Sequence, residues 1–142
     1  MKTTLNEIRK HHPCQDEWKK LLRHLNKTKP DDEPLDLLTI LESNGAHETL
    51  WCISQVAGSE EQAFYVRRIY SDMRKPFDAK WLKRRNDAYY AYLEKYGDGA
   101  DDAARLDKDG LYALSDLAFK EDSQELERKL YDFLKQFLKG TL

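Results

Sequence analysis

The chain has 142 residues, of which 40% are hydrophobic and 35% are charged, and its formal net charge is −2. This composition indicates one globular domain with a charged exterior, and the small net charge excludes a general attraction to nucleic acid or anionic membranes. No apolar run approaches the ~20 residues of a membrane-spanning helix. The first residues lack a secretory signal, and two cysteines imply no disulfide framework. We therefore expect a cytoplasmic protein with no membrane partner.

Helix signals fill the first half of the chain. Thr4 and Glu7 have the spacing of a capping box, and Pro13 ends the short helix that they begin. A second helix begins near Gln15, and apolar residues at helical intervals predict its buried side. The members of this stripe are Cys14, Trp18, Leu21, Leu22 and Leu25.

Three further helices are predicted before Pro76, which ends the last of them. The first follows the polar loop NKTKPDDEP and covers residues 35–44, and the second is short and stops before Gly58. The third begins with a capping box. The residues that mark these boundaries include Asn44-Gly45, Ser59 and Gln62.

Three helices are also predicted in the second half, before and after an acidic connector at residues 97–110. Asp78 is a suitable N-cap for the first, residues 111–118 form the second, and Asp122 or Ser123 caps the last. Apolar residues at helical intervals predict that the first and last helices each bury a stripe. These stripes consist of Trp81, Leu82, Tyr89, Tyr92, Leu93 and Tyr96, and of Leu126, Leu130, Phe133, Leu134 and Phe137.

No stretch alternates between apolar and polar residues over the length of a strand, so no strand is expected. The loops have the lengths common in helical domains. We therefore predict an all-α fold, a compact single-domain bundle of six to eight short helices that spans residues 1–142.

The stretch HHPCQDEW raises the question of a metal or catalytic site. Zinc needs three or four converging ligands, and a Cys–His pair needs a thiolate and an orienting third group. The spacing fits no common ligand pattern, and Cys14 on the apolar stripe is expected to be a small buried hydrophobe. We therefore expect no enzyme, no metal and no cofactor. The nearby candidates are His11, His12, Cys14 and His24.

The string RLDKDGLYALSD weakly matches a calcium-binding loop, with Asp107, Asp109 and Gly110 at the third, fifth and sixth positions. Arg105 at the first position would repel the ion, and the last ligand is Asp116 where such loops use Glu. A turn between two helices is the better interpretation.

Charge is unevenly distributed along the second half of the chain. Residues 67–85 carry a net charge of +6, and residues 86–127 carry −8. Faces of one charge steer association with partners of the opposite charge, although acids can also serve as loop and cap residues. The residues expected to contact a protein partner are Arg84 and Arg85 on the basic side and Asp98, Asp101 and Asp102 on the acidic side.

The basic segment also interleaves cations with aromatic residues, in RRIYSDMRKPFDAKWLKRRNDAYYAY. This combination is one ingredient of nucleic-acid binding, through phosphate contacts and base stacking. The same spacing also predicts a core-facing helix with a solvated basic face. A small nucleic-acid-binding protein is therefore the alternative, using Arg67, Arg68, Lys80, Lys83, Arg84 and Arg85.

Residues 14–56 carry a distinctive string, CQDEWKKLLRHLNKTKPDDEPLDLLTILESNGAHETLWCISQV. Its features include Cys14 with Asp16 and Trp18, His24-Leu25, Asp31-Asp32-Glu33-Pro34-Leu35, the run from Leu38 to Gly45, and Leu50-Trp51-Cys52. On these residues, this third of the chain resembles an N-terminal module of small bacterial and prophage proteins, the Imm-5-like immunity proteins. The resemblance implies an all-helical fold and a mobile-element setting, and it implies no catalytic residues.

The half of the chain at residues 1–75 is thus family-like, and residues 76–142 diverge from the family. Together, the residues and the resemblance favour a non-enzymatic protein-binding accessory protein of bacterial or phage origin. It would act through charged helical surfaces, either as an immunity protein that binds a toxin or as an inhibitor that binds a defence-system component.

Overall fold

The structure is a computed structural model that describes residues 1–97 and 111–141, and the side chains of residues 118–141 in the second of these ranges. The prediction of an all-α fold is confirmed, because the described residues form six α-helices, one π-helical segment and two very short strands. Two of the helices are long, with 37 and 29 residues, so the prediction of short helices only is wrong.

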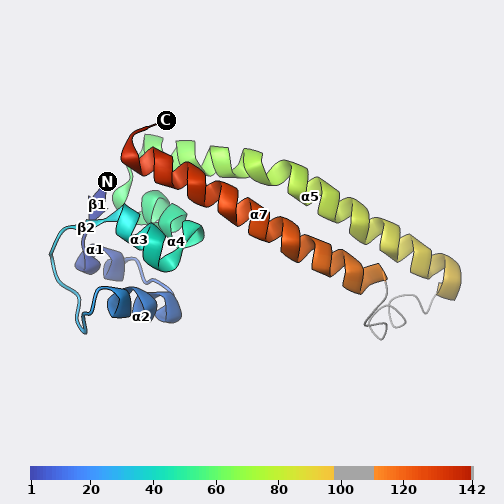
Figure 1. Cartoon of the computed structure of the whole chain (residues 1–142), viewed down its shortest axis with the longest axis horizontal. Coiled ribbons are helices and arrows are strands. Elements are labelled where there is room, and N and C mark those ends of the chain that lie inside the picture. Colours follow the sequence, from blue (N-terminus) through green and yellow to red (C-terminus); the bar gives the residue numbers. More distant parts are fainter. Residues whose placement is uncertain (98–110, 142) are drawn as a thin grey trace. The chain divides into compact units, whose positions relative to one another are not determined.

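The chain divides into two compact units. The first unit holds residues 1–71 and 127–142, and the second holds residues 72–126. The prediction that residues 1–142 form a single domain stays a prediction. The elements in chain order are β1 (Lys2–Thr3), α1 (Leu5–Lys10), α2 (Gln15–His24), β2 (Leu35–Asp36), α3 (Leu37–Asn44), α4 (Ala46–Cys52), the π-helix η1 (Ile53–Ala57), α5 (Glu60–Tyr96) and α7 (Leu111–Lys139) (Figure 1).

The structure contains one small sheet that the sequence analysis did not predict. Lys2 of β1 pairs with Asp36 of β2, and Thr3 pairs with Leu35, in an antiparallel register. Strands of two residues are too short to show alternation, which is why Leu35 was expected in a helix. That helix, α3, begins after Asp36, whose Oδ1 accepts a hydrogen bond from the Leu38 backbone N–H at 2.9 Å.

The main hydrophobic cluster lies in the first unit. Leu37 and Ile53 are fully buried, and α7 returns to contribute Leu130 and Leu134 with no exposed surface. Leu130 and Leu134 belong to the apolar stripe that was predicted for the last helix. The core cluster consists of Leu5, Ile8, Leu21, Leu35, Leu37, Ile40, Leu41, Ala46, Cys52, Ile53, Val66, Leu130 and Leu134.

The prediction that Pro76 ends a helix is wrong, because α5 continues through it from Glu60 to Tyr96. Proline has no N–H to donate to the carbonyl of Asp72, and a proline inside a helix costs about 3 kcal/mol. Packing of the turns on both sides must offset this cost. Asp78, expected as an N-cap, lies inside the helix with Oδ2 3.5 Å from Nε of Arg74.

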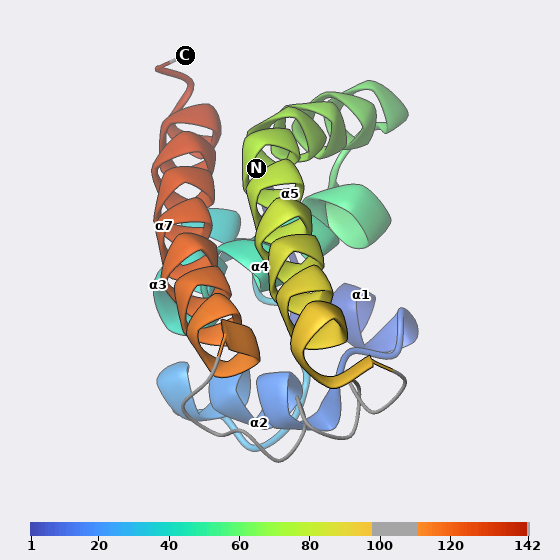
Figure 2. The ribbon, with the colours of Figure 1, turned by 90° about the vertical axis from the view of Figure 1, so that its right-hand side faces the viewer.

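The predicted break at Asp122 or Ser123 is also absent, because α7 is one helix from Leu111 to Lys139. Instead of capping a helix, Asp122 pairs with two cations of α5 within the second unit. In this unit α5 and α7 lie side by side in both views (Figures 1 and 2). The ring centroids of Trp81 and Phe119 are 5.1 Å apart and mark the contact between them.

Candidate protein-binding surfaces

The N-terminal histidines lie on the surface. Neither His11, His12 nor His24 is buried, and among the residues that the structure describes no three His, Cys, Asp or Glu side chains could hold a metal ion. Cys14 is exposed too, so the prediction that it is a buried hydrophobe is wrong. Its φ of −55° and ψ of 136° make it the N-cap of α2, and the helical stripe does not extend to a residue with extended backbone.

The other cysteine, Cys52, is buried with 3% of its surface exposed. Burial, with a smaller contribution from the negative charge of Glu48, raises the pKa of its thiol to about 12. The pKa of Glu48 is also raised, first by its own partial burial and then by repulsion from Glu17. A thiol with this pKa carries almost no thiolate at neutral pH, so Cys52 is a packing residue rather than a nucleophile.

Most cations of the basic segment at residues 67–85 already have carboxylate partners. At least five of its eight Lys and Arg side chains lie within ion-pair distance of an acid among the described residues. These neighbours reduce the positive potential that a phosphate group would meet. The pairs and their N–O distances are Arg74–Asp78 at 3.5 Å, Lys75–Asp72 at 3.0 Å, Lys80–Asp122 at 3.6 Å, Lys83–Asp87 at 2.8 Å and Arg84–Asp122 at 2.9 Å.

The two arginines expected to contact a partner have contacts inside the second unit. Arg84 donates from Nη1 to Oδ2 of Asp122, and both side chains are partly buried. The guanidinium carbon of Arg85 lies 5.9 Å from the centre of the Trp81 ring, which is a cation–π arrangement. Arg84 therefore joins α5 to α7, whereas the Arg85–Trp81 contact lies within α5. The contact of both arginines with a partner stays a prediction.

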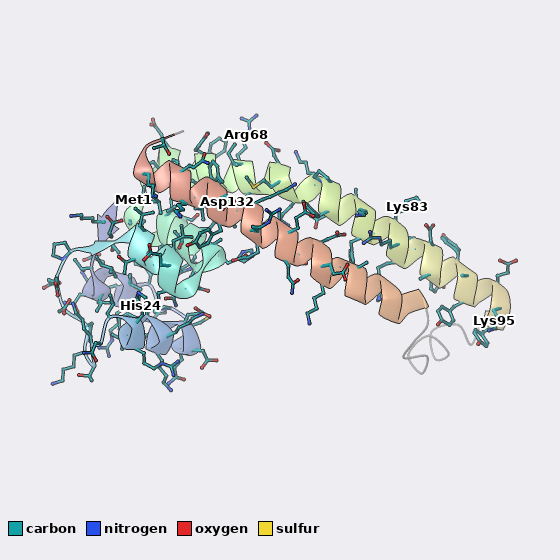
Figure 3. The ribbon with its side chains drawn as sticks, in the orientation of Figure 1. Met1, His24, Arg68, Lys83, Lys95 and Asp132 are labelled. Atoms are coloured by element: carbon teal, nitrogen blue, oxygen red, sulfur yellow. The ribbon has the colours of Figure 1, made fainter. Side chains whose placement is uncertain are left out.

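Arg67 and Arg68 belong to the first unit. The Arg67 Nε donates to the backbone carbonyl of Ala63 at 3.2 Å, which orients its side chain along α5. Arg68 is exposed on the same helix (Figure 3). The acids expected on the partner surface, Asp98, Asp101 and Asp102, lie outside the described residues, as does the calcium-like string from Arg105 to Gly110 with the side chain of Asp116.

An open groove of about 520 Å³ lies on the first unit, between η1 and the first turns of α5. Phe64 is 62% exposed at this groove. Gly58 lines the groove, and a Cβ at this position would collide with the backbone carbonyl of Ile53. The lining residues are Ser54, Gly58, Glu60, Glu61, Ala63, Phe64 and Arg67.

A second apolar surface lies on the part of α5 that belongs to the second unit. The prediction that its whole stripe is core is wrong, because exposed fractions reach 54% at Leu82, 37% at Tyr89 and at Leu93, and 44% at Tyr96. Among the stripe residues that follow Trp81, Tyr92 alone is buried, with 5% of its surface exposed. This part of α5 is apolar on two faces, and periodicity alone does not show which face is covered.

Neither surface was predicted from the sequence. No local signal marks the groove, because Phe64 stands between Ala63 and Tyr65 in an apolar run. The signal for the α5 stripe was its second apolar face. In the part of the chain that the structure describes, no helix is long and apolar enough to cross a membrane. Comparison with family models, with curated proteins and with solved structures found no match to this chain.

Proposed function

We propose that this chain is a non-enzymatic binding protein whose partner is another protein, and that the groove of the first unit is the contact surface. The observation that supports this proposal is the exposure of the Phe64 ring beside Arg67. Aromatic residues and arginine are enriched at protein interfaces. An aromatic ring that a partner buries near the centre of an interface can be an anchor that contributes about 2 kcal/mol or more.

The chemistry of the groove indicates the kind of partner. Glu60 and Glu61 place two carboxylates at its edge, next to the apolar ring of Phe64. A complementary protein presents an apolar side chain to Phe64 and cations to the two glutamates. A basic toxin has such a surface, and so does a basic component of a defence system.

Within this class, we propose an immunity protein or a phage-encoded inhibitor that works in the bacterial cytoplasm. The resemblance of residues 14–56 to immunity proteins supports the origin and the role. Both cysteines are free thiols, which suits a reducing compartment. Nucleic-acid binding has less support, because carboxylates neutralise most of the basic segment.

Site-specific photocrosslinking tests the proposal. A photoreactive amino acid in place of Phe64 should capture one protein in cells that carry the gene. The same amino acid in place of Tyr90, which is 65% exposed on the second unit, is the matched control and should not capture that protein.

Titration of the captured partner with purified variants then measures the contact. Phe64→Ala should weaken binding by roughly tenfold or more, whereas Tyr90→Ala should leave it within about twofold. Because Phe64 is exposed, its replacement should not lower the melting temperature. Equal affinities of Phe64→Ala and the unmodified protein would show that the groove is not the contact surface.

A further inference from the structure

The apolar surface of α5 in the second unit has the spacing of a coiled-coil seam. Leu82, Asn86, Tyr89, Leu93 and Tyr96 follow one another at intervals of 4, 3, 4 and 3 residues. These intervals place them at alternating d and a positions of a heptad, on one line along the helix. All five are exposed, so this line has no covering element among the described residues.

The face that packs within the unit is a different one. Ala88 and Tyr92 are buried, with exposed fractions of 4% and 5%, and Trp81 contacts Phe119 of α7. These residues lie at the c and g positions of the same heptad, beside the seam rather than on it. As far as the side chains are described, the contact between α5 and α7 therefore leaves the seam uncovered.

We propose that a second copy of this chain covers the seam, and that the two α5 helices form a short parallel coiled coil from residue 79 to residue 96. One observation for this partner is Asn86, the single polar residue of the seam, at an a position. An asparagine at one a position is the residue that fixes register and favours a pair of identical helices, since each copy supplies the hydrogen-bonding partner of the other.

The charges beside the seam give a second observation. Asp78 is at a g position, and Lys83 is at the following e position. In a parallel pair, the g position of one helix lies next to the following e position of the other. Asp78 of each copy therefore meets Lys83 of the other copy, which gives two equivalent ion pairs. Their present partners, Arg74 and Asp87, are exposed neighbours on the same helix and form weak pairs that can exchange.

The same register places Arg85 at g against Tyr90 at e of the second copy. A guanidinium over a tyrosine ring is a favourable contact. Tyr90 is the most exposed large apolar side chain of this helix, at 65%. The seam and the groove at Phe64 are on different units, so self-association does not depend on the proposed binding function.

The molar mass in solution tests the proposal with the full chain. Light scattering with size-exclusion chromatography should show a concentration-dependent shift from 16.8 kDa towards twice that mass. Leu93→Lys should raise the dissociation constant of the dimer by roughly tenfold or more, because it buries a charge in the seam. Ala91→Lys, which puts the same charge on an exposed f position, is the control and should leave it unchanged.

Orientation and register have their own tests. Asp78→Lys should weaken the dimer, and the double replacement with Lys83→Asp should restore it, since the pair is rebuilt with reversed charges. In a Cys14→Ser background, Asn86→Cys should form a disulfide between two copies, because a positions of a parallel pair face each other. A molar mass equal to that of a single chain, measured at every concentration up to roughly 1 mM, would overturn the proposal. So would a dimer that neither weakens with Leu93→Lys nor crosslinks through residue 86.

Discussion

Arg84 Nη1 donates a hydrogen bond to Asp122 Oδ2 across 2.9 Å, and this pair joins α5 to α7 within the second unit. The Asp122 side chain is only 14% exposed, and Lys80 lies 3.6 Å from its other oxygen. Asp122→Ala would leave Arg84 partly buried without its acceptor, a loss of about 1.5–3 kcal/mol for a hydrogen bond to a charged group. Hydrogen exchange should then accelerate in α5 beyond residue 72, with little change in the first unit.

The control for this prediction is Asp87→Ala, which removes the exposed partner of Lys83 on the same helix. Exposed pairs of this spacing contribute about 0.5 kcal/mol or less. If Asp87→Ala accelerates exchange as strongly as Asp122→Ala, the contact between the two helices does not depend on the partly buried pair.

Gly45 has a φ of +91° and a ψ of −174°, a backbone region that is open almost only to glycine. Gly45→Ala should therefore lower the free energy of unfolding by about 1–3 kcal/mol. The added Cβ would lie 3.4 Å from the Glu127 carboxylate, an ordinary contact, so the loss comes from the backbone. Urea denaturation should show it as a lower midpoint.

Gly140→Ala is the comparison for Gly45→Ala. Gly140 also has a positive φ, +70°, but it follows the last turn of α7 and a Cβ there has open space. A frayed helix end can relax, so this change should lower the denaturation midpoint much less. A larger effect at Gly140 than at Gly45 would contradict the assignment of strain.

The two thiols should differ in reactivity. Cys14 is exposed and Cys52 is buried, so a thiol reagent at neutral pH should modify only Cys14 until the protein is unfolded. Modification of Cys52 at the same rate would contradict its burial.

Alkaline pH should destabilise the protein through Cys52. Its pKa rises from an ordinary value of 9.0 to about 12 in the folded chain. Between these values the unfolded chain releases the thiol proton and the folded chain keeps it, so the free energy of unfolding falls as pH rises from 9 towards 12. Cys52→Ala should remove this part of the pH slope, whereas Cys14→Ala should leave it in place.

Nucleic-acid binding is expected to be weak and non-specific. Because five cations of residues 67–85 already have carboxylate partners, a filter-binding assay at low salt should show little retention of DNA or RNA. Tight binding that falls steeply with salt, and that is lost when Arg67 and Arg68 are replaced by Glu, would favour the nucleic-acid alternative instead.

The starts of α1 and α5 were predictable because capping is local chemistry. Thr4 Oγ1 accepts from the Glu7 N–H, as predicted, although the Glu7 carboxylate pairs with Lys10 rather than with a backbone amide. Ser59 and Gln62 form the complete capping box. Such hydrogen bonds join residues three positions apart, and sequence spacing is enough to recognise them.

The positions of helix breaks and of the exposed stripe were not predictable in this way. Pro76 and Asp122 carry local signals for ends and caps, but long-range packing of α5 and α7 overrides both. The stripe through Leu82 and Leu93 has the same periodicity as a core stripe. Only the position of a neighbouring element decides between the two, and that position depends on residues far away along the chain.

The order of the two units along the chain has a consequence for how this protein can change. Residues 72–126 interrupt a unit that starts at Met1 and is completed by the end of α7, so they have the topology of an insertion. All thirteen members of the core cluster come from the interrupted unit. Whole helical turns can therefore be gained, lost or exchanged in the inserted residues without altering a member of that cluster, which lets selection revise one surface while the first unit keeps folding.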